Sequence, residues 1–147
     1  MALAVNEACS GVSKNHGGPF GAVITCKGKV VAKSHNIVVS SHDPTAHAEI
    51  AAIRLASKKL KRFNLSDCVI YSTCEPCPMC MSALMWARIK KVYYGCTKED
   101  AENIGFDDKK FYNAIHVVKK IPSIMMHRKE CLEIFKLWKK KNDKVVY

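Results

Sequence analysis

Four side chains of the types that bind zinc or carry protons stand in two short groups of this sequence. His47 and Glu49 are two residues apart, and Cys77 and Cys80 are three residues apart. Zinc prefers imidazole nitrogen and thiolate sulfur in a tetrahedral arrangement, and a catalytic zinc site keeps three protein ligands and one open position. The pattern therefore predicts one Zn²⁺ ion per chain, held by the histidine and both cysteines, with Glu49 beside it as the proton carrier.

Each group also has a simpler interpretation. A histidine on a helix is more often an ordinary polar residue than a ligand, and an isolated C-x-x-C arises by chance or as a redox pair. A structural zinc site would need a fourth ligand, for which Cys74 is the only nearby candidate. Such a site needs no acid after the histidine, so Glu49 favours catalysis. The remaining cysteines stand in apolar surroundings and are predicted to be free thiols: Cys9, Cys26, Cys68, Cys96 and Cys131.

Helix starts must position these ligands. Residues 43–44, Asp followed by Pro, predict the start of a helix that continues to residue 60. Side chains two positions apart on a helix are separated by about 200° around its axis. His47 and Glu49 can therefore meet at one site only near the N-terminus of the helix. Pro78 predicts a second helix start, where the unpaired N–H groups favour thiolates. The sequence therefore predicts two helix N-termini that point at one metal ion.

The rest of the chain alternates strand and helix patterns. Alternation of this kind predicts an α/β fold, here a three-layer α/β/α sandwich with a mixed central sheet. Its 147 residues match a single domain, residues 1–147. Predicted strands cover residues 21–26, 30–36, 68–73, 91–96 and 123–127, and the other helices cover residues 2–15, 76–88, 128–141 and short segments up to 114.

Composition excludes several classes of protein. A hydrophobic content of 48% with 25% charged residues suits a packed core rather than disorder. No apolar run approaches the roughly 18 residues of a membrane span, and no basic leader precedes the first apolar stretch, so we expect a cytoplasmic protein without membrane contact. The net charge of +11 divides into +3 for residues 1–108 and +8 for residues 109–147. A nucleic-acid partner is possible, but a solvated lysine-rich helix face is favoured.

The two metal-binding groups together form H-x-E followed by P-C-x-x-C, the signature of zinc-dependent nucleobase deaminases. Residues 43–49 (DPTAHAE), 74–80 (CEPCPMC) and 105–108 (GFDD) resemble the cytidine-deaminase-like superfamily and, within it, the guanine deaminases. The similarity covers residues 4–108 and the extreme C-terminus. The zinc motifs are common to the superfamily. The narrower assignment depends on residues 17–21 (GGPFG), 86–88 (WAR), 105–108 and the terminal tyrosine.

The resemblance implies hydrolytic deamination of guanine to xanthine and ammonia, in purine salvage or catabolism, with Glu49 as the catalytic residue. It implies a homodimer that exchanges its C-terminal segments across a hinge at residues 115–122. Each implied binding residue also has an ordinary structural alternative, as a turn, core, loop or frayed terminal residue. The implied substrate-binding residues are Asn36 on the purine edge, Phe20 and Trp86 on its two faces, Asp108 on a ring N–H, and Tyr147 as the closing residue.

Three other functions remain open. Close relatives accept the nucleoside, so guanosine deamination is one alternative. A tRNA adenosine deaminase shares the DPTAHAE-type segment and could use the basic C-terminal third to bind phosphates. Residues 95–100 (GCTKED), however, lack the D-x-K-x-G-A pattern associated with that family. A zinc-stabilised RNA-binding module without activity is the non-enzymatic alternative, and an intact Glu49 argues against it.

Overall fold

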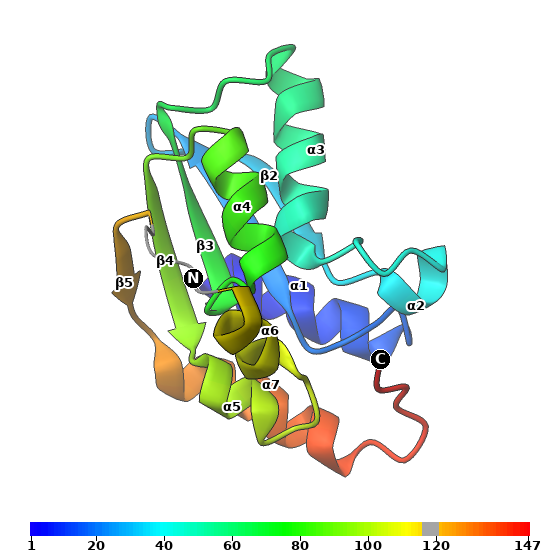
Figure 1. Ribbon diagram of the computed structural model, residues 1–147. Helices are drawn as coiled ribbons and strands as arrows, with labels where there is room; N and C mark the ends of the chain where they lie inside the picture. The colour runs from blue at the N-terminus through cyan, green and yellow to red at the C-terminus, as the bar shows by residue number, and fades with distance from the viewer. Residues whose placement is uncertain (116–120) are drawn as a thin grey trace.

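A mixed five-stranded sheet forms the centre of the molecule (Figure 1). The computed structural model describes residues 1–115 and 121–147, apart from the side chains of residues 108 and 109. The strand order is β2-β1-β3-β4-β5. β1 is antiparallel to both of its neighbours, whereas β3, β4 and β5 are parallel. The strands are β1 (Gly21–Cys26), β2 (Lys29–His35), β3 (Cys68–Cys74), β4 (Lys91–Cys96) and β5 (Ser123–Met125).

Helices cover both faces of this sheet. On one face lie α3 (Ala48–Leu60) and α4 (Pro78–Trp86), and on the other lie α1 (Ala2–Ser13) and α7 (Arg128–Lys140) (Figure 1). The predicted three-layer α/β/α sandwich is confirmed. Within the described part of the chain, no helix is both long and apolar enough to cross a membrane. Three short helices complete the fold: α2 (Val38–Ser41), α5 (Lys98–Glu102) and α6 (Asp108–Ile115).

The directions of the strands bring several strand ends together at one edge of the sheet. β2, β3, β4 and β5 all finish at the same edge, and β1 begins there, because β1 alone runs in the opposite direction. α3 packs closely on this part of the sheet since Ala48, Ala52 and Ala56, spaced four apart, are fully buried. Small side chains let the helix approach the strands. The loops and helix starts at this edge therefore face one another.

The helix start predicted at residues 43–44 is wrong. α3 begins at Ala48, with His47 as its N-cap in an extended conformation. The Asp43 Oδ1 atom instead accepts hydrogen bonds from the backbone N and the hydroxyl of Thr45, at 2.8 and 2.7 Å. This local turn competes with helix formation. The short helix α2, which the sequence pattern did not predict, lies just before this turn.

Asp100 connects α5 to the start of α7. Thr97 and Asp100 form a capping box, in which the Thr97 N–H donates to Asp100 Oδ2 at 2.9 Å. Arg128 donates two further hydrogen bonds to the same carboxylate, at 2.6 and 3.1 Å. Burial opposes ionisation, but these hydrogen bonds keep the pKa of Asp100 below its ordinary value of 3.8. The far end of α7 leads to the C-terminal residues, so this contact helps to orient them.

Replacing Asp100 with Ala should lower the free energy of unfolding by about 1 kcal/mol at pH 7, because the capping box and the ion pair are lost. A carboxyl whose folded pKa is depressed stabilises above its unfolded pKa and loses this effect as the pH falls through the folded value. The difference between variant and parent should therefore shrink below about pH 4. Urea unfolding of variant and parent at pH 7 and pH 3.5 measures this difference in the free energy of unfolding. Glu133→Ala, which breaks an exposed ion pair with Lys136, should cause no measurable change at either pH.

Candidate active site

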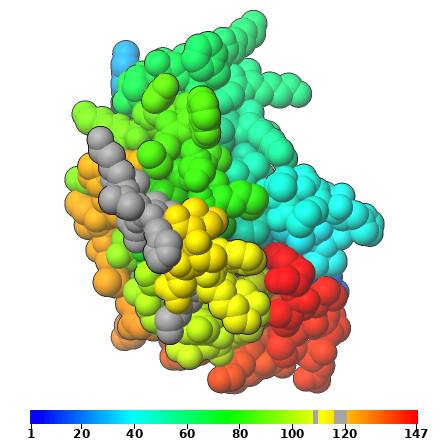
Figure 2. All heavy atoms as spheres, in the orientation of Figure 1, coloured from blue at the N-terminus to red at the C-terminus, as the bar shows by residue number. Residues whose placement is uncertain are grey.

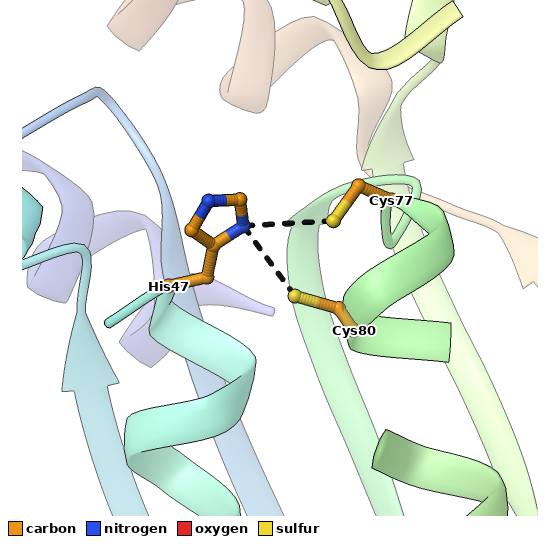
Figure 3. A group of neighbouring side chains, drawn as sticks. All are labelled: His47, Cys77 and Cys80. Carbon is orange, nitrogen blue, oxygen red and sulfur yellow. Dashed lines mark hydrogen bonds between the residues drawn. The ribbon is translucent and has the colours of Figure 1, made fainter. Parts of the chain in front are cut away.

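Two helix N-termini converge on the predicted metal-binding residues (Figure 3). His47 is the N-cap of α3, and Cys77 is the N-cap of α4, where Pro78 is the first helical residue. His47 Nδ1 lies 3.6 Å from Cys77 Sγ and 3.5 Å from Cys80 Sγ. All three donor atoms lie within 4.8 Å of one another. Figure 3 shows the imidazole facing both sulfur atoms across the gap between the helix starts.

These distances fit a zinc ion. A tetrahedral site with ordinary Zn–S and Zn–N bond lengths separates its nitrogen and sulfur atoms by about 3.5 Å. Cys74 lies outside the donor group, because its Sγ donates to the backbone oxygen of Thr97 at 3.5 Å. The donor group therefore has the three protein ligands of a catalytic site rather than the four of a structural one.

The two cysteine thiols have opposite pKa shifts. A hydrogen bond from Cys80, assisted by His47, lowers the pKa of Cys77. The same hydrogen bond, together with burial, raises the pKa of Cys80. Metal binding requires both sulfurs as thiolates, so it would release a proton from this pair.

Glu49 lies in the first turn of α3 beside the donor group. Its side chain is buried, and Ser72 of β3 donates to Oε1 at 2.8 Å. Its second oxygen, Oε2, lies 3.5 Å from Cys80 Sγ. Burial raises the pKa of this carboxyl above its ordinary value. The carboxylate is therefore oriented by Ser72 and lies next to the position of the metal.

A small pocket lies beside these residues, at the edge where the parallel strands end. It brings together six of the predicted site residues, whereas Trp86 is not among its lining residues. The lining residues are Phe20, Asn36, His47, Glu49, Cys74, Glu75, Cys77, Phe106 and Tyr147.

Asn36 presents a free hydrogen-bond donor in this pocket. Its side chain is 1% exposed, and Oδ1 accepts from Val38 N at 3.2 Å and from the Tyr147 hydroxyl at 2.5 Å. Among the described residues, its Nδ2 has no hydrogen-bond partner. Gly17 allows this arrangement, because a Cβ atom there would lie 2.2 Å from Asn36 Oδ1. A buried amide of this kind needs a partner, which a bound ligand can supply.

Tyr147 reaches the pocket from the C-terminus. Its hydroxyl accepts a hydrogen bond from Gly18 N at 3.1 Å, and its ring packs edge-on against Phe106 at 5.5 Å. Figure 2 shows the C-terminal residues, in red, lying against both the cyan region around α2 and the yellow region around α6. The tail thus closes the pocket of its own chain in this structure.

Two predicted binding residues are not placed in the pocket. Trp86 is 80% exposed at the last position of α4. The helix carries it about 13.5 Å from Cys77, since α4 starts at the site and rises 1.5 Å per residue. The expected stacking of a ligand between Phe20 and Trp86 is therefore not formed within one chain. Asp108 begins α6, but its side chain lies outside the described part of the structure.

Three residues of the site were missed by sequence reasoning. Phe106 packs edge-to-face against Phe20 at 4.8 Å and also lines the pocket. Glu75 directly follows buried strand β3, a position that could have indicated it. Tyr112 of α6 donates from its hydroxyl to the oxygen of Pro76, next to the ligand Cys77. No sequence signal marks Tyr112, because the contact joins segments far apart in the chain.

Comparison with known proteins identifies the class of enzyme to which this fold and site belong. The family model of the cytidine and deoxycytidylate deaminase zinc-binding region matches residues 1–96. The chain belongs to this family of zinc-dependent deaminases. It is a hydrolytic enzyme of that class, and its donor group is of the kind that the zinc-binding region supplies.

Within this family, the chain is similar to guanine deaminase of Bacillus subtilis. The two are 45% identical over 147 residues, which cover 98% of this chain and 94% of that protein. The crystal structure of the Bacillus enzyme matches with a TM-score of 0.76 and 44% identity, covering 99% of this chain and 95% of the other. A tRNA-specific adenosine deaminase of Buchnera aphidicola subsp. Schizaphis graminum is 36% identical over 116 residues, covering 79% of this chain and 76% of that protein. The predicted resemblance to guanine deaminases is confirmed.

The donor geometry predicts how zinc content responds to mutation. The purified chain should contain one zinc ion, and Cys77→Ser should lose it because one of three protein ligands is removed. Cys74→Ala should retain the metal, since Cys74 lies outside the donor group. Metal analysis after exhaustive dialysis measures both. Zinc loss from the Cys74→Ala variant would show that this residue is a ligand after all.

Proposed function

We propose that this protein is a zinc-dependent guanine deaminase, which converts guanine and water to xanthine and ammonia in purine salvage or catabolism. The observation that carries this proposal is the position of Glu49, which is buried beside the three candidate metal donors and lines a pocket together with Asn36, whose Nδ2 has no partner among the described residues. The similarity to the Bacillus subtilis guanine deaminase over nearly the whole chain supports the same substrate.

In this proposal, the side chain of Glu49 carries out the proton transfers of the reaction. When bound by His47, Cys77 and Cys80, zinc supplies Lewis acidity that makes water nucleophilic near neutral pH. Glu49 takes a proton from the attacking water and delivers it to the purine ring nitrogen beside C2. The water oxygen bonds to C2 and keeps its second proton. Glu49 then takes this proton from the C2 hydroxyl and passes it to the amine, so that C2=O forms as the bond from C2 to the exocyclic nitrogen breaks and ammonia leaves. Ser72 holds Oε1 throughout, which keeps the carboxylate oriented.

Substrate binding uses aromatic and amide groups. Phe20 and Phe106 offer apolar ring surface for a planar base. The free Nδ2 of Asn36 donates to an acceptor on the purine edge. Asp108, at the start of α6, accepts a hydrogen bond from a ring N–H of the base. Tyr147 then excludes water above the bound ring.

A substrate panel tests the proposal against its alternatives. The zinc-loaded enzyme should release ammonia from guanine, and only slowly or not at all from guanosine, adenine, cytosine and a tRNA anticodon stem-loop. Glu49→Gln should keep zinc and fold but lose about 10³-fold or more in kcat, because the proton carrier is removed while the shape is kept. Glu133→Gln, an exposed position on α7, is the matched control and should be fully active.

Two outcomes would contradict this assignment. Turnover of the stem-loop without turnover of guanine would make the chain a tRNA adenosine deaminase, a function that the basic C-terminal third could serve. Activity of the Glu49→Gln variant within about tenfold of the parent would assign proton transfer to another residue.

We also propose that the enzyme is a homodimer whose protomers exchange their C-terminal segments. An exposed apolar hollow on the outer side of α3 and α4 supports association, since such surfaces usually meet a partner. It includes Phe63 at 85% exposure and Trp86 at 80%. Residues 141–147 form neither helix nor strand, so their contacts could equally be made with a partner's pocket. The expected hinge, residues 115–122, lies largely outside the described residues.

Deleting Tyr147 should raise KM for guanine about tenfold or more without releasing zinc, because two hydrogen bonds and the closing ring are lost. Tyr147→Phe, which keeps the ring, should cause a smaller increase. Steady-state kinetics with light scattering measures both effects and the oligomeric state. A truncated enzyme with unchanged kinetics would show that the tail has no role in the site.

Mixed dimers distinguish exchange from closure within one chain. A Glu49→Gln chain supplies an intact tail, and a chain lacking Tyr147 supplies an intact Glu49. If tails are exchanged, co-expression of the two creates one complete site, so activity with the parent KM should return. If each tail closes its own pocket, no complete site forms and the mixture stays as impaired as its parts.

A further inference from the structure

Cys26 and Cys68 face each other at the end of the sheet farthest from the active site. Cys26 is the last residue of β1 and Cys68 the first of β3, and the two are directly opposite in the antiparallel pairing. Opposed residues in such a pair project from the same face of the sheet, with backbones close enough for a disulfide. Cys26 is half-buried, whereas Cys68 is fully buried.

Polar groups of opposite charge surround this pair. Cys26 Sγ donates to Asp67 Oδ2 at 3.3 Å, and Cys68 Sγ donates to Oδ1 at 3.5 Å. The two sulfurs and the carboxylate all lie within 4.8 Å of one another. Arg62 completes the group, because its Nη2 lies 2.5 Å from Asp67 Oδ1 and 3.7 Å from Cys26 Sγ.

This arrangement suits thiol chemistry better than metal binding. Two sulfurs and a carboxylate could hold a thiophilic cation, but the Arg62 guanidinium already lies against the same three residues and would repel it. The two sulfurs instead lie within 4.8 Å of each other on directly paired residues, which is the placement that a disulfide needs. We propose that Cys26 and Cys68 form a reversible disulfide on exposure to a small-molecule disulfide such as oxidised glutathione.

The reaction starts at Cys26, which is the more accessible sulfur. Burial raises the pKa of the Cys68 thiol to about 12, so this residue remains protonated in the reduced pair. The Cys26 thiolate attacks one glutathione sulfur, forming a mixed disulfide and releasing one glutathione thiolate. Cys68 loses its proton by way of Asp67, attacks the Cys26 sulfur and releases the second glutathione. Two protein thiols are oxidised, one glutathione disulfide is reduced, and both protons end on the glutathione products.

The bond would stabilise the fold without touching the catalytic residues. It closes a loop over residues 26–68, which contains α3 with His47 and Glu49, and so restricts the unfolded chain. The active site lies at the other end of β1, about 17 Å away along a strand that rises 3.3 Å per residue. Oxidation should therefore change resistance to unfolding while leaving turnover of guanine unchanged.

The test uses the zinc-loaded enzyme in glutathione buffers of increasing oxidised fraction. After alkylation of free thiols and proteolysis, mass spectrometry should find the linked peptides of Cys26 and Cys68. Without reductant, the Tm of the oxidised enzyme should rise by about 5–10 °C and return to its starting value with dithiothreitol. Cys26→Ser should abolish both effects. Cys9→Ser, which removes an exposed cysteine on α1, should leave both unchanged.

Either of two results would overturn the proposal. One is that Cys26 and Cys68 remain free thiols under conditions in which Cys9 becomes glutathionylated. The other is a second zinc ion per chain that is lost in Cys26→Ser and blocks oxidation, which would make the cluster a metal site. Because peptide mass and Tm are the readouts, neither result depends on which base the enzyme deaminates.

Discussion

The active site depends on two helices that begin face to face at the same edge of the sheet. His47 caps α3, Cys77 caps α4, and the imidazole nitrogen lies within 3.6 Å of both sulfurs. Helix N-termini carry unpaired N–H groups and the positive end of the helix dipole, so both stabilise thiolates at this point. β3 sets the relative position of the helices, because it leads directly into α4 and supplies Ser72 to Glu49.

The opposite wall of the pocket has a different origin. Asn36 directly follows β2, Gly17 lies in the loop after α1, and Tyr147 comes from the C-terminus. These segments meet only because β2, β3 and β4 finish together. The candidate metal donors thus lie at helix starts, while the polar groups on the other side of the pocket lie on loops and a chain end. Such a division allows the substrate to differ between relatives that share the same zinc chemistry.

Five of the eight cysteines illustrate three physically distinct environments. Cys77 and Cys80 lie with His47 in the candidate metal-binding group. Cys131 is buried in the apolar layer under α7, where burial raises its pKa to about 11 and keeps it unreactive. Cys26 and Cys68 lie neither in the metal-binding group nor in the apolar layer. They contact charged groups at the far end of the sheet. Separation of the pair from the zinc ligands lets thiol oxidation and catalysis proceed independently.

The sequence by itself determined the layered α/β fold and the zinc-deaminase motifs, whose histidine, two cysteines and acid the structure brings together. Those features depend on short-range spacing and on strand–helix alternation, which are local properties of the chain. The start of α3 was misplaced because the Asp43 side chain satisfies the backbone of Thr45 before the helix can begin. Trp86 was assigned to the pocket although its helix runs away from the site, and Phe106 took its place beside Phe20. Only the tertiary structure decided these positions, because the direction of a helix and the approach of distant segments are set by packing on the sheet rather than by neighbouring residues.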